Sequence, residues 1–177
     1  MGARYDWHSV YAPLDGNEHF VKEMAIFDDT NNRQEFSVAS GSIGANYKID
    51  EQWSLAANVA TGFRAPSIFE LYAGGEHGGV QAFQIGNPDL KAETSLNTDL
   101  SLRWQTSKSQ MVATVYQNWV ENYIYLANTG YYRAKEGAPN EGERVDVTAP
   151  GAIVEMQSQQ TDAKISGFEF SFNHRFN

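Results

Sequence analysis

At its most regular point the chain reads Ser95-Leu96-Asn97-Thr98-Asp99-Leu100-Ser101-Leu102-Arg103-Trp104-Gln105. Leucine, threonine and tryptophan occupy every second position, and polar or charged residues occupy the positions between them. A period of two residues places the two sets on opposite faces of a β-strand, because successive side chains of a strand point to opposite sides. The stretch therefore predicts a strand with one apolar face and one polar face.

The same alternation predicts further strands on both sides of this one. Residues 3–11, 36–49 and 53–63 alternate before it, with a slip expected near Ser40-Gly41. Near the end of the chain, polar residues alternate with Phe168, Phe170, Phe172 and Phe176. Residues 110–126 favour a strand, but both of their faces are mixed, so their register stays open. The predicted fold class is all-β, with about six antiparallel strands connected up and down.

The connections between these strands alternate in length. Residues 12–34, 64–92 and 128–151 form long connections, whereas 50–51 and 106–109 form tight turns. Outer-membrane β-barrels have this pattern, with short periplasmic turns and long extracellular loops. A soluble sandwich has no reason to place every long loop at one end. The sequence therefore predicts a segment of a transmembrane barrel whose extracellular loops contain at most a short helix.

Strand direction then places the aromatic residues in two rows. Tyr47, Trp53, Trp104 and Phe176 fall at the periplasmic ends, and Tyr11 and Phe63 fall at the outer ends. Aromatic girdles at two heights are typical of barrels in lipid, although aromatic residues also favour strands in general. The alternation predicts that lipid is faced by Leu55, Val59, Leu96, Leu100, Leu102, Trp104 and Phe172. It predicts that the lumen is faced by His8, Asn58, Asn97, Asp99, Arg103 and Glu169.

Composition excludes several other classes of protein. The 177 residues contain no cysteine and carry a formal net charge of −9. The chain therefore has no disulfide and no thiolate metal site, and an acidic chain without a basic patch does not favour nucleic acid as a partner. It also has no apolar run of about 18 residues that could form a spanning helix, and its start lacks the apolar core of a signal peptide.

The number of strands bears on the domain organisation. About six strands are too few to close a barrel, because the smallest barrels have about eight and an open edge in lipid leaves unpaired backbone groups. We therefore expect residues 1–177 to form one partial barrel domain, an interior slice of a larger barrel.

The long connection 64–92 has its own local signals. Pro66 presets the backbone for a first helical turn, so residues 67–72 can form a short helix, and Arg64 and Glu70 can pair across it. Asn87-Pro88 starts a turn, in which Asp89 can accept hydrogen bonds from backbone N–H groups. These residues, with Tyr72, are predicted to shape the loop, and ligand binding is the alternative role.

Two segments of this connection resemble a known family. Gly62-Phe63-Arg64-Ala65-Pro66-Ser67-Ile68-Phe69-Glu70-Leu71-Tyr72 and Gly86-Asn87-Pro88-Asp89-Leu90-Lys91-Ala92-Glu93 resemble paired motifs of TonB-dependent outer-membrane receptors. Residues 122–126 and 162–169 are similar to two later barrel strands of that family. The resemblance implies a barrel of about 22 strands in the outer membrane of a Gram-negative bacterium. It also implies outer-membrane lipid around the barrel, and a plug, absent from this sequence, through which the inner-membrane TonB complex drives uptake.

The insert between the two motifs, residues 73–85, is most similar to that of zinc-uptake receptors, although Gly-Glu-His replaces their Gly-Pro-His. Here His77 follows Glu76 among glycines, and imidazole nitrogen and carboxylate oxygen are both ligands of Zn²⁺. Two ligands do not make a site, so others must come from elsewhere, and a solvated loop histidine is the alternative. The expected ligand is zinc ion as transported cargo rather than a cofactor, and acidic loops favour a cation over an anionic chelate.

Other functions stay open or are disfavoured. A siderophore or haem receptor of the same fold is the nearest alternative, and a small self-contained porin or adhesin is the alternative from another class. The sequence contains neither a Gly-x-Ser-x-Gly elbow nor a His-Glu-x-x-His motif. Asp6 with His8 is the one pair that a barrel-lip hydrolase could use, and it lacks a third group. We therefore expect no enzymatic activity and no catalytic residues.

Overall fold

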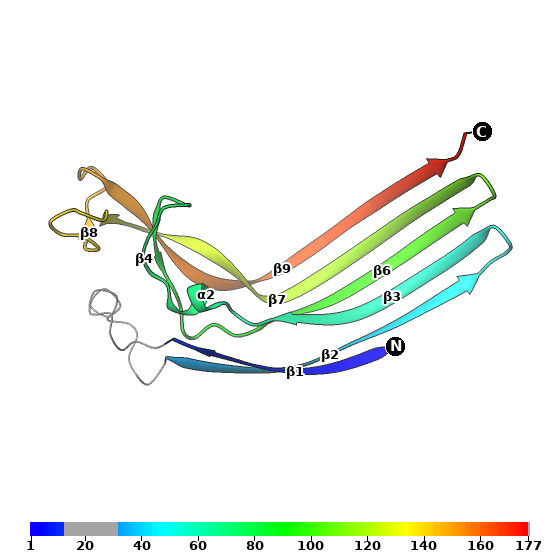
Figure 1. Cartoon of the computed structure of the whole chain (residues 1–177), viewed down its shortest axis with the longest axis horizontal. Helices are drawn as coiled ribbons and strands as arrows, with labels where there is room; N and C mark the ends of the chain where they lie inside the picture. The colour runs from blue at the N-terminus through cyan, green and yellow to red at the C-terminus, as the bar shows by residue number, and fades with distance from the viewer. Residues whose placement is uncertain (13–31, 177) are drawn as a thin grey trace.

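The computed structural model describes residues 1–12 and 32–176 and is built almost entirely of strands. Six long strands run antiparallel in one curved, open sheet (Figure 1). They are β1 (Gly2–Tyr11), β2 (Arg33–Lys48), β3 (Trp53–Arg64), β6 (Glu93–Gln105), β7 (Ser109–Ala134) and β9 (Ala152–His174). Their order in the sheet is their order in the chain, which confirms the up-and-down connection. Among the described residues, no helix is long and apolar enough to cross a membrane.

The two ends of the sheet differ as the connection lengths predict. The β2–β3 and β6–β7 turns lie together at one end, and the longer connections that follow β3 and β7 lie at the other end, called the loop end below (Figure 1). The loop end adds α2 (Ile68–Tyr72), β4 (Gly74–His77), β5 (Ala82–Ile85) and β8 (Arg144–Val145). β4 and β5 form a hairpin, and β5 also pairs in parallel with residues 154–157 of β9. Residues 13–31, most of the predicted first long connection, lie outside the described part of the chain.

Two expectations about the strands were wrong. β7 continues to Ala134 and β9 begins at Ala152, so the third long connection covers 135–151 rather than 128–151. The pairing of β7 with β9 shifts register between Val120 and Tyr123 and again between Asn128 and Tyr132. Each extra residue moves the following side chains to the opposite face, so the two-residue period that sequence analysis needs is lost.

The slip expected near Ser40-Gly41 does not occur, because β1 and β2 pair in continuous register there.

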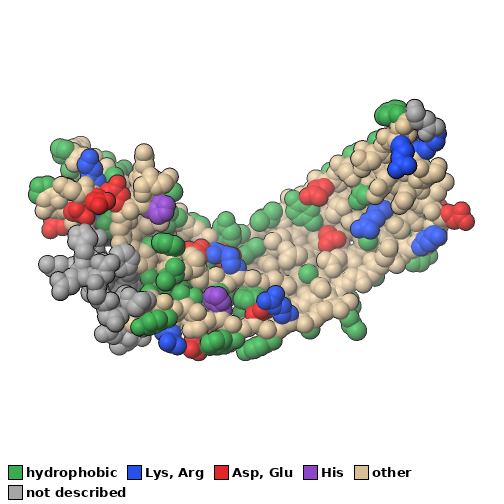
Figure 2. All heavy atoms as spheres, viewed as in Figure 1, with side chains coloured by type: hydrophobic (Ala, Val, Ile, Leu, Met, Phe, Trp, Pro, Cys, Tyr) green, Lys and Arg blue, Asp and Glu red, His purple; other side chains and the backbone are tan. Residues whose placement is uncertain are grey.

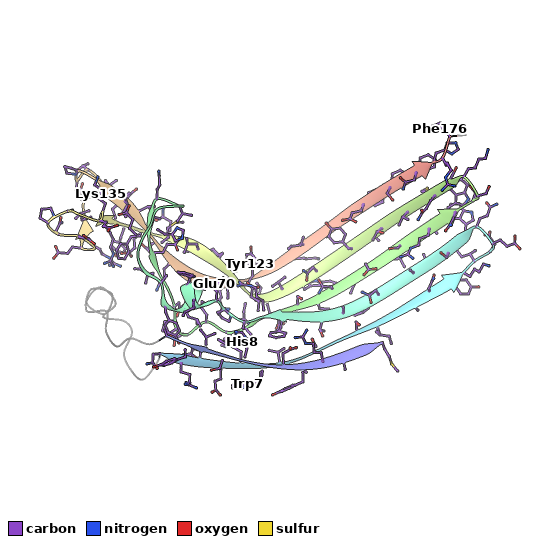
Figure 3. The ribbon with its side chains drawn as sticks, in the orientation of Figure 1. Trp7, His8, Glu70, Tyr123, Lys135 and Phe176 are labelled. Carbon is purple, nitrogen blue, oxygen red and sulfur yellow. The ribbon has the colours of Figure 1, made fainter. Side chains whose placement is uncertain are left out.

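Register confirms the predicted division into two faces. Leu100 lies opposite Ala57 on β3 and Val115 on β7, and Val115 lies opposite Phe168 on β9. One residue along, on the other face, the Asn58 amide donates to Asp99 at 3.2 Å. His8, Asp99 and Arg103 share this polar face through the registers of β1, β2, β3 and β6. Figure 3 shows Trp7 and His8 on opposite sides of β1.

Aromatic side chains mark the turn end of the apolar face. Trp53 and Trp104 lie opposite each other, with ring centroids 6.2 Å apart. The Trp104 indole donates to the Gln52 side chain at 3.1 Å, so its polar edge reaches the turn. Beyond β9, the ring of Phe176 packs edge-on against His174 at 4.8 Å. The predicted periplasmic row is therefore present at the end that carries the tight turns.

Burial is distributed unlike that of a soluble sheet protein. On the apolar face, large side chains remain exposed, with Phe168 at 65% and Leu100 at 43%. The buried cluster lies at the loop end, where α2 and the segment after β5 cover the polar-face side of β1 and β2. Its members are Val10, Ala12, Phe36, Leu71, Tyr72, Leu90 and Ile124. The 64–92 connection therefore folds over the sheet, and its own side chains fill the space beneath it.

Candidate functional site at the loop end

The first motif forms a short, capped helix bound to the end of β3. Ser67 caps α2 by accepting from the Glu70 N–H at 3.3 Å, and Glu70 accepts from the Ser67 N–H at 2.7 Å. Arg64, the last residue of β3, donates to Glu70 at 2.8 Å, which confirms the expected pair. Its other guanidinium nitrogens donate to both carboxylate oxygens of Glu93, at 2.7 and 2.8 Å. One arginine thus joins the helix to the first residue of β6.

Glu70 titrates below its ordinary range. Partial burial by itself raises the pKa of this carboxyl, but the bond from Arg64 and the two bonds with Ser67 outweigh burial and lower the pKa overall. Glu70 is therefore ionised at neutral pH, and the pair holds the helix in place.

The second motif closes the open end of the same helix. The N–H groups of Gly86 and Asn87 donate to the carbonyls of Ala73 and Glu70, at 2.7 and 2.9 Å. Helix ends leave such carbonyls unpaired, so residues 86–87 act as a cap supplied from a distant part of the loop. The Asn87 side chain accepts from the Asp89 N–H at 2.9 Å. The turn was expected to use Asp89 as its side-chain acceptor, and it uses Asn87.

Two further residues join this unit to β7 and β9. The Gln160 side chain accepts from the Lys91 N–H at 3.0 Å and donates to the carbonyls of Lys91 and Asn122, both at 2.8 Å. Glu93 also accepts from the Ile124 N–H at 2.6 Å, just past the bulge in β7. Asn122 at the bulge has a positive φ of 57°, and its N–H donates to Asp162 at 3.2 Å. Residues 122–126 and 160–162 therefore meet the loop where its chain re-enters the sheet.

A second polar cluster lies farther out, around Glu155. This carboxylate is fully buried and accepts from Arg133 at 2.5 Å, Arg144 at 2.9 and 3.1 Å and Thr129 at 2.9 Å. Sequence analysis did not select any of these residues, because they come from β7, β8 and β9 and no spacing in the chain shows that they meet. Figure 2 shows acidic and basic side chains gathered at this end.

The same cluster touches the β4–β5 hairpin. The Arg133 guanidinium lies 4.7 Å from the ring centre of Phe83 and donates to the Gly142 carbonyl. The Arg144 guanidinium stacks 3.7 Å from the ring centre of Tyr131. Arg133 therefore connects β9, the 135–151 connection and the hairpin of the 64–92 connection, so the two connections are held together.

The predicted metal ligands lie on the edge strand β4. Glu76 and His77 are both exposed, and the Glu76 carboxylate accepts from the Glu136 N–H at 2.8 Å. Within residues 1–12 and 32–176, no three histidine, aspartate or glutamate side chains are close enough together to hold a metal ion. Further ligands for this pair would have to come from outside those residues.

Tyr72 lies in the buried cluster beneath the loop, at 3% exposure. Burial raises the pKa of its phenol. It shares this cluster with Leu71, and its loop-shaping role stays a prediction.

An open antiparallel sheet with an exposed apolar face, aromatics at the turn end and long loops at the other end defines a piece of an outer-membrane β-barrel. The chain belongs to the family described as TonB dependent receptor-like, beta-barrel, whose profile matches residues 1–177. The motif resemblance at the family level is therefore confirmed, and the protein is placed in the outer membrane of Gram-negative bacteria.

Individual relatives cover different parts of the chain. The iron-regulated outer membrane virulence protein of Vibrio cholerae is 44% identical over 34% of this chain and 9% of its own length. The heme/hemopexin utilization protein C of Haemophilus influenzae is 30% identical over 94% of this chain and 25% of its own length. The copper transporter OprC shares the fold over 99% of this chain and 22% of its own, with a TM-score of 0.63 and 20% identity.

These comparisons bear on the extent of the chain and on its function. The chain spans a quarter or less of the length of these relatives. The relatives named above are an outer membrane virulence protein, a utilization protein and a transporter, not enzymes, as the sequence predicted. Their names refer to iron, haem and copper, and the finer resemblance to zinc-uptake receptors has no counterpart among these three relatives.

Proposed function

We propose that this chain forms part of the wall and mouth of an outer-membrane receptor that takes up a scarce metal-containing nutrient. The observation that carries the proposal is the unit built from the two motifs, in which Arg64, Glu70, Glu93 and the 86–87 cap fix a loop over the polar face. Such a loop narrows the mouth of a polar channel without forming a catalytic centre. In this proposal, lipid covers the apolar face, and His8, Asp99 and Arg103 line the lumen.

Energy for uptake would come from the inner-membrane TonB complex, acting through a plug inside the barrel. The family supports this part, since its members depend on TonB by name. The polar face supports it too, because Asn58, Asp99, Ser101 and Thr114 present a hydrogen-bonding wall to whatever fills the barrel.

For the cargo, an iron siderophore or haem is as well supported as zinc ion. Relatives named for haem, hemoglobin and enterobactin favour an iron-containing ligand. The pair Glu76 and His77, exposed on an edge strand at the mouth, favours a metal ion that binds nitrogen and oxygen. The two cargoes differ in what they require of His77, because zinc needs its neutral imidazole as a ligand.

Growth of the host strain tests both cargoes. The strain lacking the intact receptor is compared with strains that carry the receptor or its His77→Ala variant, under zinc limitation and with haem or a ferric siderophore as the only iron source. His174→Ala, at the turn end, serves as the control histidine. A zinc receptor supports growth under zinc limitation only with His77 present. An iron-chelate receptor supports growth on its chelate with either residue at position 77. If the receptor does not improve growth in any of these media, the uptake proposal is contradicted.

A further inference from the structure

On the apolar face of the described strands, charged side chains lie only near the loop end. One row across the sheet, in register, consists of Trp53, Trp104, Met111 and Phe172, and the row four steps higher consists of Thr61, Leu96, Trp119 and Lys164. The three rows between them on this face of the described strands contain no charged side chain. Lys164 therefore stands at the upper limit of an uncharged band.

The height of this band matches a membrane. Lys164 and Phe172 lie eight residues apart on β9, which is about 27 Å along a strand. A strand tilt of about 40° reduces this to about 21 Å of vertical height, against an apolar band of about 25 Å in outer-membrane barrels. The long lysine stem can then carry its ammonium group outward to the headgroup level.

Lys164 lies against an aromatic ring, and it has no carboxylate partner among the described residues. Its ammonium nitrogen is 5.8 Å from the ring centre of Trp119, its neighbour in register on β7. The acids two residues along each strand bind other groups: Glu121, two residues from Trp119, accepts from the Thr94 hydroxyl, and Asp162, two residues from Lys164, accepts from the Asn122 N–H. Among the described residues, Lys164 forms no ion pair. The charge is thus left for a group outside the protein.

A second pair repeats the arrangement on the same face. The Arg33 guanidinium lies 5.2 Å from the ring centre of Tyr11, its partner in register, also at the loop end. An aromatic ring at the boundary of the acyl chains, with a cation above it, suits a lipid whose headgroup is a phosphate.

We propose that Trp119 and Lys164 form a docking site for the phosphate headgroup of an anionic lipid in the outer leaflet, with Trp119 against the acyl chains and Lys164 on the phosphate. The inference depends on the position of the barrel in the membrane and not on the transported cargo. If the uptake proposal fails, the inference of a lipid site is therefore unaffected.

The test measures lipid retention by the intact receptor. The receptor is purified in a neutral detergent and titrated with phosphatidylglycerol or with phosphatidylcholine, and retained lipid is counted by native mass spectrometry. One lysine near an anionic surface contributes about 1 kcal/mol, which corresponds to about fivefold in affinity. We therefore expect Lys164→Gln to weaken phosphatidylglycerol retention about fivefold, with phosphatidylcholine unchanged and with Lys164→Arg restoring the retention.

Lys48→Gln is the matched control, because Lys48 lies on the polar face near the opposite end of the sheet. Equal retention by the Lys164→Gln and parent receptors would overturn the proposal, and so would an equal loss in Lys48→Gln. Excess inorganic phosphate separates a lipid site from a site for free phosphate. If it displaces the lipid completely, the headgroup phosphate alone is recognised, and docking of a lipid is contradicted.

Discussion

Gly86 lies against the backbone of Leu71 so closely that no side chain fits between them. A Cβ atom built on Gly86 would stand 2.5 Å from the carbonyl carbon and oxygen of Leu71. The contact exists because the Gly86 and Asn87 N–H groups must reach the carbonyls at the end of α2. The glycine that opens the second motif and the helix that ends the first are therefore one structural element.

Gly86→Ala is expected to loosen this element. Forcing a methyl group into packed backbone costs about 1–3 kcal/mol, and here the loss falls on the cap of α2. Limited proteolysis of the intact receptor should show faster cleavage within 64–92. Gly78→Ala, at a position with nothing within 4 Å of the added Cβ, should cleave like the parent. Equal cleavage of both variants would show that the cap does not hold the loop.

Acid should release the same loop. The folded-state pKa of Glu70 lies below its ordinary value of 4.5, so its contribution is complete above that value and is lost as pH falls through the folded-state pKa. Cleavage within 64–92 should therefore rise as the pH falls below about 4.5. Glu70→Gln should cleave faster than the parent at neutral pH and should show a weaker rise in acid. A parent receptor with no change across this range contradicts the role given to the Arg64–Glu70 pair.

The two faces of the sheet should respond in opposite ways to a new charge. Leu100→Arg places a cation on the apolar face and should cost about 2–4 kcal/mol if that position lies near the midplane of the bilayer. Glu169→Arg, on the exposed polar face, should be close to neutral. Unfolding titrations in lipid vesicles measure both. Ser101 on the same polar face is unsuitable as the control, because it is 6% exposed and bonded to Thr114. Similar costs for the two arginines would rule out the face assignment.

Glu155→Gln should separate the two outer connections. Breaking a buried ion pair typically costs about 3–5 kcal/mol, and the loss would fall on the contact between Arg133 and Glu155. Hydrogen exchange of residues 135–151 and of the β4–β5 hairpin should rise together, because Arg133 touches both. Glu143→Gln, an exposed position, is the control. A rise confined to one connection would mean that they are not coupled through Arg133.

Sequence reasoning succeeded where contacts are local or periodic. The faces of β3 and β6 follow from alternation, and the Arg64–Glu70 pair follows from residues six apart around one short helix. It failed where bulges break the period, as in β7 near Asn122, and where partners are far apart in the chain. Glu155 and Gln160 bind residues from β7 and from the loop, and only the register of β7 with β9 brings these groups together.

The parallel pairing of β5 with β9 also sets an order of events during folding. Residues 82–85 find their partners at 154–157, far along the chain, whereas α2 and its cap need only nearby residues. Contacts with large sequence separation form late, because the intervening chain must first lose its freedom. The helix unit can therefore assemble early, whereas the β4–β5 hairpin can pair only after β9 has paired with β7. The pairing of β7 with β9 thus precedes the final shape of the loop end.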